Sequence, residues 1–584
     1  MPVPISDVKL HFVESVDDAQ EFLRWLGQSR EILAVDTETS GFHWYGPDTL
    51  RLVQFGDADA GWSISYRNWR GLIEKALRDY TGDVVMHNSS FDQHFLEAHG
   101  LSTVPVHRLH DTMIADTLID PTRSHGLKPA AERIYPGVMG GQALLKDAFH
   151  RNKWNWSSVP ENFPLYHQYA ALDTVLTARL YSALMPQVQP YRVAYDREMA
   201  AMSVLFRAET RGMRIDPFYT SNLLAEWTQE AEGLLLELNN LGLENPNSGR
   251  QLAAAMALTE DWEPEAWTET GMPAVDASIL KGIDSEISRR VLRYRRLTKW
   301  NGAYLSTFLN KRDANDHVHP TIRNIQARTG RMSITGPALQ TLPRGSYIRD
   351  CVLPDEGQSM WAVDYDTMEM RMFAHYSQDP RLVQAVHEGQ DLHLFAAREI
   401  YGDPNMSKDD KRRSLAKNTG FGILFGAGDA KTAETAGVDV ETAKAFRAAY
   451  KERYTGVDTF MSQIDEIGRK RRVETGRGYI TTWGGRYSPA DDKRLYALLN
   501  YLIQGSCADL FKDKIIALDS AGYGDNIILP VHDELLFNFP EGDTESIQDV
   551  VSLMEERERF SVPFTVGVSG PLTRWGDKAR KEES

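Results

Sequence analysis

One segment, MWAVDYDTMEMRMFAHYSQDP at positions 360–380, sets a carboxylate at the end of a buried strand. The apolar run Met360–Val363 predicts that strand, which ends at Asp364, and Met368–Tyr376 predicts an amphipathic helix directly after it. A carboxylate is costly to bury alone, but it is tolerated there when it binds a metal ion. The rest of the chain must therefore supply a second carboxylate, cations and a substrate groove around this strand end.

The net charge of −17 argues at first against a nucleic-acid partner. Basic residues nevertheless cluster at Arg289–Lys299, Lys408–Lys417 and Arg469–Arg472, which flank carboxylate motifs. A single cluster of this kind is more often a solvated helix face. Three of them favour contact with phosphates, because such contact requires local cations rather than a positive total charge.

The composition, 42% hydrophobic and 25% charged over 584 residues, is typical of a globular chain of several domains. The two cysteines, Cys351 and Cys507, cannot build a disulfide framework and fit a reduced compartment. No apolar run reaches transmembrane length, and the first residues carry no signal-peptide pattern. These features predict a soluble cytoplasmic protein with no membrane partner.

Residues 1–190 predict an α/β unit. Its first clear strand is Ile32–Val35, which ends in Asp36-Thr37-Glu38. Further predicted strands are Leu50–Gly56, Gly61–Ser65 and Asp83–Met86, and the predicted helices are Ser90–Gly100 and Leu165–Met185. The next stretch, to about 310, predicts long helices with charged faces: Arg197–Arg211, Thr220–Leu241 and Glu286–Leu309. From about 326 onward, strands and helices mix again.

Acidic residues recur in three short segments of the first unit. Asp36 and Glu38 are two positions apart, so on a strand they point to the same face. Asp92 follows in NSSFD, and Tyr169 and Asp173 lie four apart on a predicted helix. Four converging acids would repel one another, whereas two divalent ions remove that penalty and create a nucleophile for phosphodiester hydrolysis. Tyr169 is the candidate that orients the attacking water.

The ordered set DxE, NxxxD and YxxxD resembles the proofreading 3′–5′ exonuclease domain of DNA polymerases, in the subtype with a tyrosine in its third motif. Each fragment alone is weak, and a single YxxxD on a helix is usually structural. The resemblance covers about residues 25–185, and it implies metal ligands at Asp36, Glu38, Asp92 and Asp173.

A second group of candidate residues begins after position 407. Ser407 and Asp410 predict a capping box. Steps of four then place two cations and two aromatics along one slowly winding helix face: Arg413, Lys417, Phe421 and Phe425. The cations suit a triphosphate, and Phe421 suits a sugar or base. The alternative is an ordinary amphipathic helix with snorkelling cations. The glycines at 420, 422 and 426 count against it, because each weakens a helix by about 1 kcal/mol.

A predicted hairpin supplies the second carboxylate. Asn526–Leu529 and Leu535–Phe539 predict two strands joined by a turn at Pro530–Glu534. That turn would present three polar side chains outward: His532, Asp533 and Glu534. Because acids are common in turns, this motif alone is worth little.

In chain order, DYDTMEMR, RxxxKxxxFGxxFG and VHDE resemble motifs A, B and C of family A DNA polymerases, the group of bacterial DNA polymerase I. Further fragments match the same family: TGR at 329–331 with LQTLP at 339–343, DLH at 391–393, GYxxT with GR at 478–486, and NxxxQG at 500–505. The resemblance spans nearly the whole chain. Its layout, which begins with the exonuclease, is similar to the short polymerases of bacteriophages.

The resemblance implies a multidomain chain of α/β and α+β units, in which a ribonuclease H-like exonuclease domain precedes a right-hand polymerase. The expected divisions are 1–190 for the exonuclease, 191–325 for a mainly helical thumb, 326–380 for the first part of the palm, 381–490 for the fingers and 491–584 for the rest of the palm.

For the polymerase site, the resemblance implies that Asp364, Asp533 and the backbone carbonyl of Tyr365 hold two Mg²⁺ ions, with Glu534 close by. One ion lowers the pKa of the primer 3′-hydroxyl, and the other braces the triphosphate and the leaving pyrophosphate. Lys417 is the implied proton donor to pyrophosphate. Two further Mg²⁺ ions are implied for the exonuclease site, and Mn²⁺ can substitute.

The resemblance also implies the substrate contacts. Arg413 and Lys417 would grip the β and γ phosphates, and His393 would add a phosphate contact. Glu369 would block a ribose 2′-hydroxyl. Phe421 would pack on the sugar and discriminate against dideoxynucleotides. The minor groove, template or primer terminus would be contacted by Arg331, Asn500, Gln504 and His532.

Two positions depart from the family pattern. Phe425 stands where the family often has a tyrosine, so a hydroxyl that could bond Glu369 is missing. Pro530 stands where relatives often carry a polar residue. The first change puts the expected sugar selection in doubt.

The main hypothesis is therefore a template-directed DNA polymerase with proofreading. Its implied partners are primer–template DNA and dNTPs, bound by a monomer in the bacterial cytoplasm. One alternative is a single-subunit RNA polymerase, which Glu369 and the exonuclease signature oppose. Another is a DNA-binding protein or exonuclease with a decayed polymerase domain. That alternative is opposed because unpaired acids are costly to keep.

Overall fold

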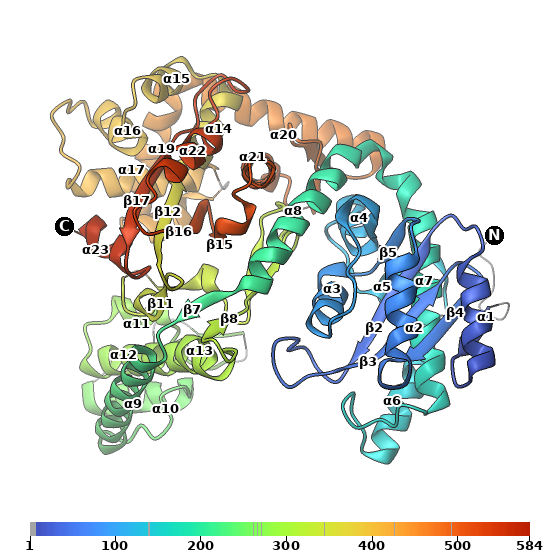
Figure 1. The fold of residues 1–584 in the computed structure, drawn as a ribbon. Coiled ribbons are helices and arrows are strands. Elements are labelled where there is room, and N and C mark those ends of the chain that lie inside the picture. The colour runs from blue at the N-terminus through green and yellow to red at the C-terminus, as the bar shows by residue number, and fades with distance from the viewer. Residues whose placement is uncertain are drawn as a thin grey trace.

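The structure is a computed structural model of the chain. It describes residues 8–583 apart from 138–139, 261, 265–266, 270, 344, 425–426 and 492. Figure 1 shows an N-terminal unit in blue and a C-terminal half in yellow to red, with helix α8 (Arg192–Arg211) running between them. Among the described helices, none is both long and apolar enough to cross a membrane.

The N-terminal unit is built on a six-stranded sheet of order β1-β4-β3-β2-β5-β6. β3 runs antiparallel to both of its neighbours, and the other pairings are parallel. Helix α7 (Pro164–Val188) packs across five of the strands. The strands are β1 (Lys9–Phe12), β2 (Leu33–Thr39), β3 (Leu50–Gly56), β4 (Ala60–Ser65), β5 (Val84–Met86) and β6 (Leu109–Asp111).

Six shorter helices complete this unit: α1 (Val16–Leu26), α2 (Tyr66–Asp79), α3 (Ser89–Ala98), α4 (Thr112–Ile119), α5 (Leu127–Ile134) and α6 (Gly140–Asn152). The predicted end of the first strand at Val35 is wrong, because β2 continues to Thr39. Its backbone stays paired with β3 from Ala34 to Thr39, and this ladder extends the strand beyond the apolar run. Asp36 and Glu38 therefore lie within β2, as the predicted shared face of this pair requires.

Helices follow α8, as the sequence predicts: the long α9 (Pro217–Asn240), α10 (Gly249–Glu260) and α12 (Glu286–Trp300), and the short α11 (Ala277–Gly282) and α13 (Ser306–Asn310). The helix predicted over Glu286–Leu309 is present, but a π-helical turn, Asn301–Leu305, stands between α12 and α13, and the backbone stays helical through both junctions. Gly302 lies in that turn and lowers the local helix propensity.

The C-terminal half is centred on an antiparallel sheet of order β15-β16-β12-β17. Its strands are β12 (Gln358–Tyr365), β15 (Ile527–Val531), β16 (Glu534–Pro540) and β17 (Val566–Leu572). The predicted turn Pro530–Glu534 is too wide, because Pro530 and Val531 pair with β16. The turn contracts to His532 and Asp533, and His532 takes a left-handed backbone with φ of 57°.

Small strand pairs connect the two halves. β7 (Met213–Ile215) pairs with β8 (His317–Val318) and β11 (Val352–Leu353), and β9 (Thr321–Arg323) pairs with β10 (Ser333–Thr335). The loop between β9 and β10 carries the TGR sequence. The TGR sequence therefore lies in the loop of the β9–β10 hairpin.

The remaining helices of this half lie between and after the strands of the four-stranded sheet in chain order. Those after β12 are α14 (Met368–Ser377), α15 (Pro380–His387), α16 (Leu392–Tyr401), α17 (Lys411–Leu424), α18 (Asp429–Ala436), α19 (Val440–Arg453) and α20 (Thr455–Thr475). After the hairpin β13 (Tyr479–Thr481) and β14 (Tyr487–Pro489) come α21 (Ala497–Ser520), α22 (Glu545–Met554) and α23 (Asp577–Glu583). α14 and α21 pack against each other beside the sheet.

The predicted capping box at Ser407 is wrong. Helix α17 begins at Lys411, and the Asp410 carboxylate accepts a hydrogen bond of 2.9 Å from the backbone N–H of Arg412. Ser407 instead accepts with its carbonyl from the Asp410 N–H in the preceding turn. Asp410 therefore caps the first turn of α17, and Ser407 lies before the helix.

Candidate active sites

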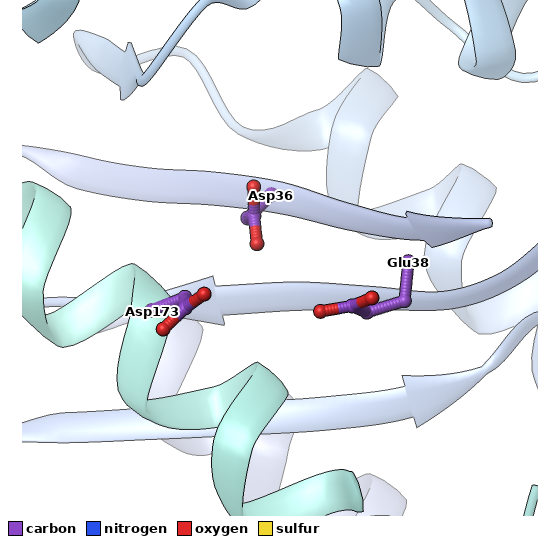
Figure 2. Close-up of side chains that lie close together, drawn as sticks. All are labelled: Asp36, Glu38 and Asp173. Carbon is purple, nitrogen blue, oxygen red and sulfur yellow. The ribbon is translucent and has the colours of Figure 1, made fainter. Parts of the chain in front are cut away.

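Three carboxylates of the N-terminal unit lie together where β2 passes beside α7. Asp36 and Glu38 leave the same face of β2, and Asp173 meets them from α7 (Figure 2). One oxygen atom from each of the three lies within 4.8 Å of the other two. Carboxylate oxygens at this spacing fit a divalent cation such as Mg²⁺.

Asp92 lies beside this group rather than within it. It sits in the first turn of α3, is almost fully buried, and accepts a hydrogen bond of 2.6 Å from the Thr37 hydroxyl. Burial and the neighbouring charge of Asp36 hold the pKa of Asp92 well above its usual range. The structure thus brings three of the four predicted acids into one cluster and places the fourth next to Asp36.

Burial and mutual repulsion make the ionised forms of the clustered acids unfavourable. Burial raises the pKa of Asp36 to about 6. Burial and the charge on Asp36 together raise the pKa of Glu38 to about 8. Because a bound divalent ion stabilises ionised carboxylates, it would reverse both shifts. This chemistry supports a metal site at the cluster.

Sequence reasoning missed a lysine in this site. Lys128, on α5, is buried and forms an ion pair with Asp173. Its ammonium nitrogen also lies 4.4 Å from the ring centroid of Tyr169. Burial raises the pKa of the Tyr169 phenol. Nothing in the segment SHGLKPAAERI sets this lysine apart, because its partners are far along the chain.

The second site lies at adjacent strand ends of the four-stranded sheet. Asp364 near the end of β12 stands opposite Glu534 at the start of β16. The Tyr365 N–H donates to the Asp533 carbonyl over 3.2 Å. Burial, reinforced by the charge on Asp364, raises the pKa of the Asp533 carboxyl. The carboxylates of Asp364, Asp533 and Glu534 supply oxygen ligands of the kind Mg²⁺ prefers.

A second lysine also escaped the sequence analysis. Lys578, on α23, is largely buried, and its ammonium nitrogen lies 3.2 Å from an Asp364 carboxylate oxygen. It also forms an ion pair with Glu534. The C-terminal helix thus brings a cation to the carboxylates of the second site. The sequence RWGDKARKEES offers several basic residues and does not indicate which one turns inward.

Glu369 is held by two of the predicted substrate-contacting residues. Arg331 forms an ion pair with it, and the Gln504 amide donates to the same carboxylate over 3.3 Å. Arg331 also approaches Asp533, at 3.8 Å. Burial raises the pKa of Glu369. The TGR loop and α21 therefore meet at this carboxylate.

Helices α16 and α17 bring three of the remaining predicted residues together. Arg413 forms an ion pair of 2.6 Å with Asp391, the residue that also caps α16. Burial and the charge of Lys417 lower the pKa of His393 to about 4, so its imidazole is neutral at pH 7. The side chain of Phe421, and Phe425 as a whole, lie outside the described residues.

A cavity of about 590 Å³ lies between the second site and helices α17 and α18. Its lining includes Arg331, Glu369, Asn418, Thr432, His532 and Asp533. This volume is in the range of small-molecule sites.

Asn500, on α21, has a buried side-chain oxygen with no hydrogen-bond partner among the described residues. A buried acceptor without a partner is a group to which a bound ligand can donate a hydrogen bond.

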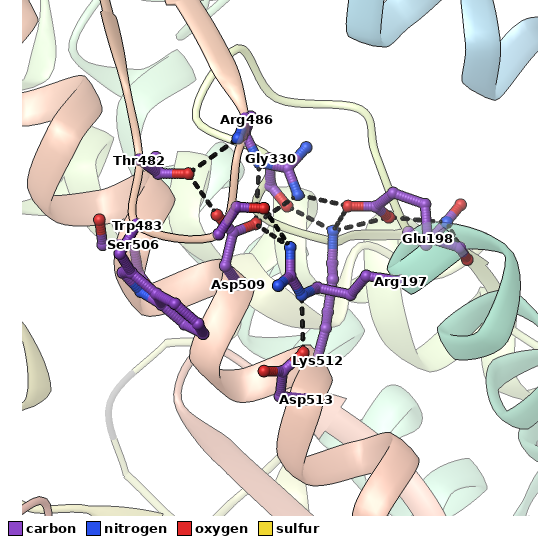
Figure 3. A network of polar contacts seen from close by, with 12 residues as sticks. Arg197, Glu198, Gly330, Thr482, Trp483, Arg486, Ser506, Asp509, Lys512 and Asp513 are labelled. Atoms are coloured by element: carbon purple, nitrogen blue, oxygen red, sulfur yellow. Dashed lines mark hydrogen bonds and ion pairs between the residues drawn. The ribbon is translucent and has the colours of Figure 1, made fainter. Parts of the chain in front are cut away.

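A buried ion-pair network positions the TGR loop (Figure 3). Lys512 donates to both carboxylate oxygens of Glu198, at 2.6 and 2.9 Å, and to the Gly330 carbonyl at 2.7 Å. Arg486 donates to Asp509 at 2.7 Å and also contacts Glu198. All four charged side chains are almost completely buried, so each depends on its partners.

The network also explains the glycine of the TGR sequence. Gly330 has a φ of 74°, a conformation that disfavours other residues. A Cβ atom there would lie 2.5 Å from the Arg486 guanidinium. The loop that carries Arg331 is therefore pressed against the network, which links it to α8 and α21.

We expect Asp509→Ala to destabilise the fold by about 3–5 kcal/mol, because it removes a buried partner of Arg486. The matched control is Asp519→Ala, also on α21. Asp519 is about one-third exposed and pairs with the similarly exposed Arg207, so its loss should cost about 1 kcal/mol or less. Guanidinium unfolding of both variants measures the difference, and equal losses would contradict the role given to the network.

Two carboxylate centres on one chain, one of them beside a cationic helix and a cavity, are expected of a nucleic-acid enzyme with two active sites. Comparison with known proteins identifies the family. Residues 219–577 match the model described as DNA polymerase family A, and residues 10–189 match the model of a 3′–5′ exonuclease. The chain belongs to DNA polymerase family A. It is a DNA-directed DNA polymerase that carries an exonuclease domain.

Similar proteins occur in phages and bacteria. The chain is 32% identical to a DNA polymerase of Mycobacterium phage D29, over 94% of both chains, and 31% identical to that of phage L5, over 97% of both. It is 28% identical to DNA polymerase I of Treponema pallidum, over 86% of this chain and 52% of that one. It thus spans about half of that bacterial polymerase.

The fold is also similar to a solved structure, the POL domain of Pol1 from M. smegmatis in complex with DNA primer-template and dNTP. The TM-score is 0.78 at 24% identity, over 97% of this chain and 99% of that one. The predicted fold class, family and enzyme class are confirmed. The relatives named here are DNA polymerases, so the RNA polymerase alternative gains no support.

Proposed function

We propose that the chain adds deoxynucleotides to a primer 3′ end by two-metal phosphoryl transfer and removes nucleotides from that end by 3′–5′ proofreading hydrolysis. The observation that carries this proposal is the pair of separate carboxylate centres. Asp36, Glu38 and Asp173 form one; at the other, Asp364 stands opposite Glu534 on paired strands and Asp533 lies in the adjoining turn. Divalent cations bound at each centre would activate the attacking oxygen and stabilise the leaving oxygen.

In the synthesis site, Asp364, Asp533 and the Tyr365 carbonyl would hold two Mg²⁺ ions. Glu534 would lie close by in a supporting role; it pairs with Lys578, which also reaches Asp364, so the ions would have to share these carboxylates with the lysine. His393 on α16 and Arg413, Lys417 and Phe421 on α17 would contact the incoming nucleotide. The same role is proposed for Phe425, which lies outside the described residues. Arg413 is held by Asp391, so a triphosphate would have to share or replace that partner.

Contacts to the primer and template are assigned to Arg331, Asn500, Gln504 and His532. The buried network behind Gly330 fixes the loop on which Arg331 stands. The unsatisfied oxygen of Asn500 supports a ligand contact. We further assign pyrophosphate protonation to Lys417, whose charge is near the neutral imidazole of His393.

In the exonuclease site, Asp36, Glu38, Asp92 and Asp173 would hold two further Mg²⁺ ions, and Tyr169 would orient the attacking water. The proposed divisions are 1–190 for the exonuclease, 191–325 for the thumb, 326–380 and 491–584 for the palm, and 381–490 for the fingers. We propose that the enzyme acts on primer–template DNA as a monomer. Its phage and bacterial relatives favour work in the bacterial cytoplasm.

Removal of divalent metals tests this function directly. With EDTA, both nucleotide addition and 3′ shortening of a labelled primer should stop, because each centre depends on metal-activated oxygens. Added Mg²⁺ or Mn²⁺ should restore both activities. Either activity persisting in excess EDTA would contradict the two-metal mechanism at that site.

Glu369→Ala should admit ribonucleotides, because its side chain is the proposed block against a 2′-hydroxyl. We expect a gain of about tenfold or more in the ratio of rNTP to dNTP incorporation, in the range of discrimination set by single contacts. Glu369→Gln, which keeps the volume, should retain most of the exclusion. Glu356→Ala, an exposed residue before β12, serves as the control. Unchanged sugar selectivity in Glu369→Ala would refute the assignment.

A further inference from the structure

The buried lysine of the exonuclease site has no role in the function proposed so far. Lys128 is 6% exposed and stands in the first turn of α5, which packs on α7. Its ammonium pairs with Asp173 and lies over the Tyr169 ring. The charges of Asp36 and Glu38 also act on it. Within the part of the chain that the structure describes, the strong interactions of this ammonium are therefore with the carboxylate cluster or its tyrosine.

The plain alternative is a structural lysine whose stem fills the space beside α7. Such side chains usually reach water with their charged end. Lys128 does not, and α5 is already anchored by two buried alanines, Ala130 and Ala131. Burying an ammonium is costly unless acids surround it. The acids of the site account for the burial, whereas the packing of α5 does not require a charge.

We propose that Lys128 is a positioning residue of the exonuclease site, which holds Asp173 and Tyr169 in place and competes with the divalent cation for Asp173. The inference rests on the exonuclease function proposed above. Asp173 is the shared partner, because it pairs with Lys128 and also belongs to the three-carboxylate cluster. A cation entering that cluster must share Asp173 with the lysine. Lys128 therefore weakens metal binding while it orders the groups that use the metal.

This role predicts two opposite effects when the charge is removed. Metal should bind more tightly, because a positive charge next to the ligands is gone. Hydrolysis should slow, because Asp173 and Tyr169 lose the group that aligns them. A purely structural lysine predicts weaker metal binding together with slower hydrolysis. The direction of the change in metal affinity separates the two.

The experiment measures Mn²⁺ binding by EPR titration of the full-length chain. Asp364→Asn and Asp533→Asn are introduced together to silence the synthesis site. In this background, Lys128→Met should bind Mn²⁺ about tenfold more tightly or better, since one nearby charge is removed. Lys128→Arg keeps the charge and should stay within about threefold of the parent. Shortening of a single-stranded 3′ end should fall about a hundredfold in Lys128→Met and much less in Lys128→Arg.

Unchanged or weaker Mn²⁺ binding by Lys128→Met would overturn the inference. Thermal melting without metal checks that the variant folds. If Lys128→Met does not fold, Lys128→Gln, which retains a polar end, replaces it. Unchanged or weaker Mn²⁺ binding by that variant would likewise overturn the inference. Asp36→Asn separates failure of this inference from failure of the proposed function. If Asp36→Asn leaves Mn²⁺ binding intact, the metal site itself is misassigned. If it abolishes binding while Lys128→Met changes nothing, only the role of Lys128 falls.

Discussion

Asp364→Ala should abolish nucleotide addition and leave 3′ shortening intact. Asp364 stands opposite Glu534 on paired strands, its charge acts on Asp533, and it is not part of the N-terminal carboxylate cluster among the described residues. Loss of a ligand to the catalytic metals removes several kcal/mol of charge stabilisation, which corresponds to about a thousandfold or more in rate. Single-turnover extension of a primer–template measures the first activity, and digestion of a labelled single strand measures the second.

Asp366→Ala is the matched control for this variant. Asp366 lies two positions further along, is exposed, and accepts a hydrogen bond from the Thr565 hydroxyl over 2.9 Å. It should therefore retain synthesis within about a few-fold, as expected of a surface carboxylate. If Asp366→Ala lost as much synthesis as Asp364→Ala, the special role of Asp364 would be refuted.

Asp36→Ala should show the reverse pattern, with shortening lost and synthesis kept. It removes one of three carboxylates whose oxygens lie within 4.8 Å of one another. The expected loss is again about a thousandfold or more, for the same physical reason. Asp79→Ala provides the control in this unit, because Asp79 forms an exposed ion pair with Lys75.

The two variants together test whether the sites are independent. Parallel loss of both activities in either variant, with a normal thermal melt, would mean that the centres do not work separately. Retention of shortening in Asp36→Ala would show that Asp36 is not a required ligand. The buried network that joins α8 to α21 makes the fold check essential, since distant damage could reach both units.

The sequence predicted the features that are set by a local pattern of residues. The run Met360–Val363 forms the middle of β12, and the spacing of Asp36 and Glu38 places both on one face of β2. The three-carboxylate cluster followed because Asp173 sits on a helix that crosses that strand. Ordered motifs then identified the family, which the comparisons confirm.

What the sequence missed depends on pairing between distant segments. Strand β2 runs past its apolar core because β3 pairs with it, and no local signal marks that extension. Lys128 and Lys578 turn inward because acids far along the chain surround them. The capping box failed for a different reason, namely that Asp410 stands closer to the start of the helix than Ser407 does. Long-range electrostatics were thus harder to predict than periodicity.

The most direct test of the two-site account is one gel. A labelled primer–template is incubated with the wild-type chain and Mg²⁺, with and without dNTPs. The account predicts extension when dNTPs are present and 3′ shortening when they are absent. Shortening without extension would contradict the polymerase assignments from Asp364 onward, and extension without shortening would contradict an active exonuclease at Asp36, Glu38 and Asp173.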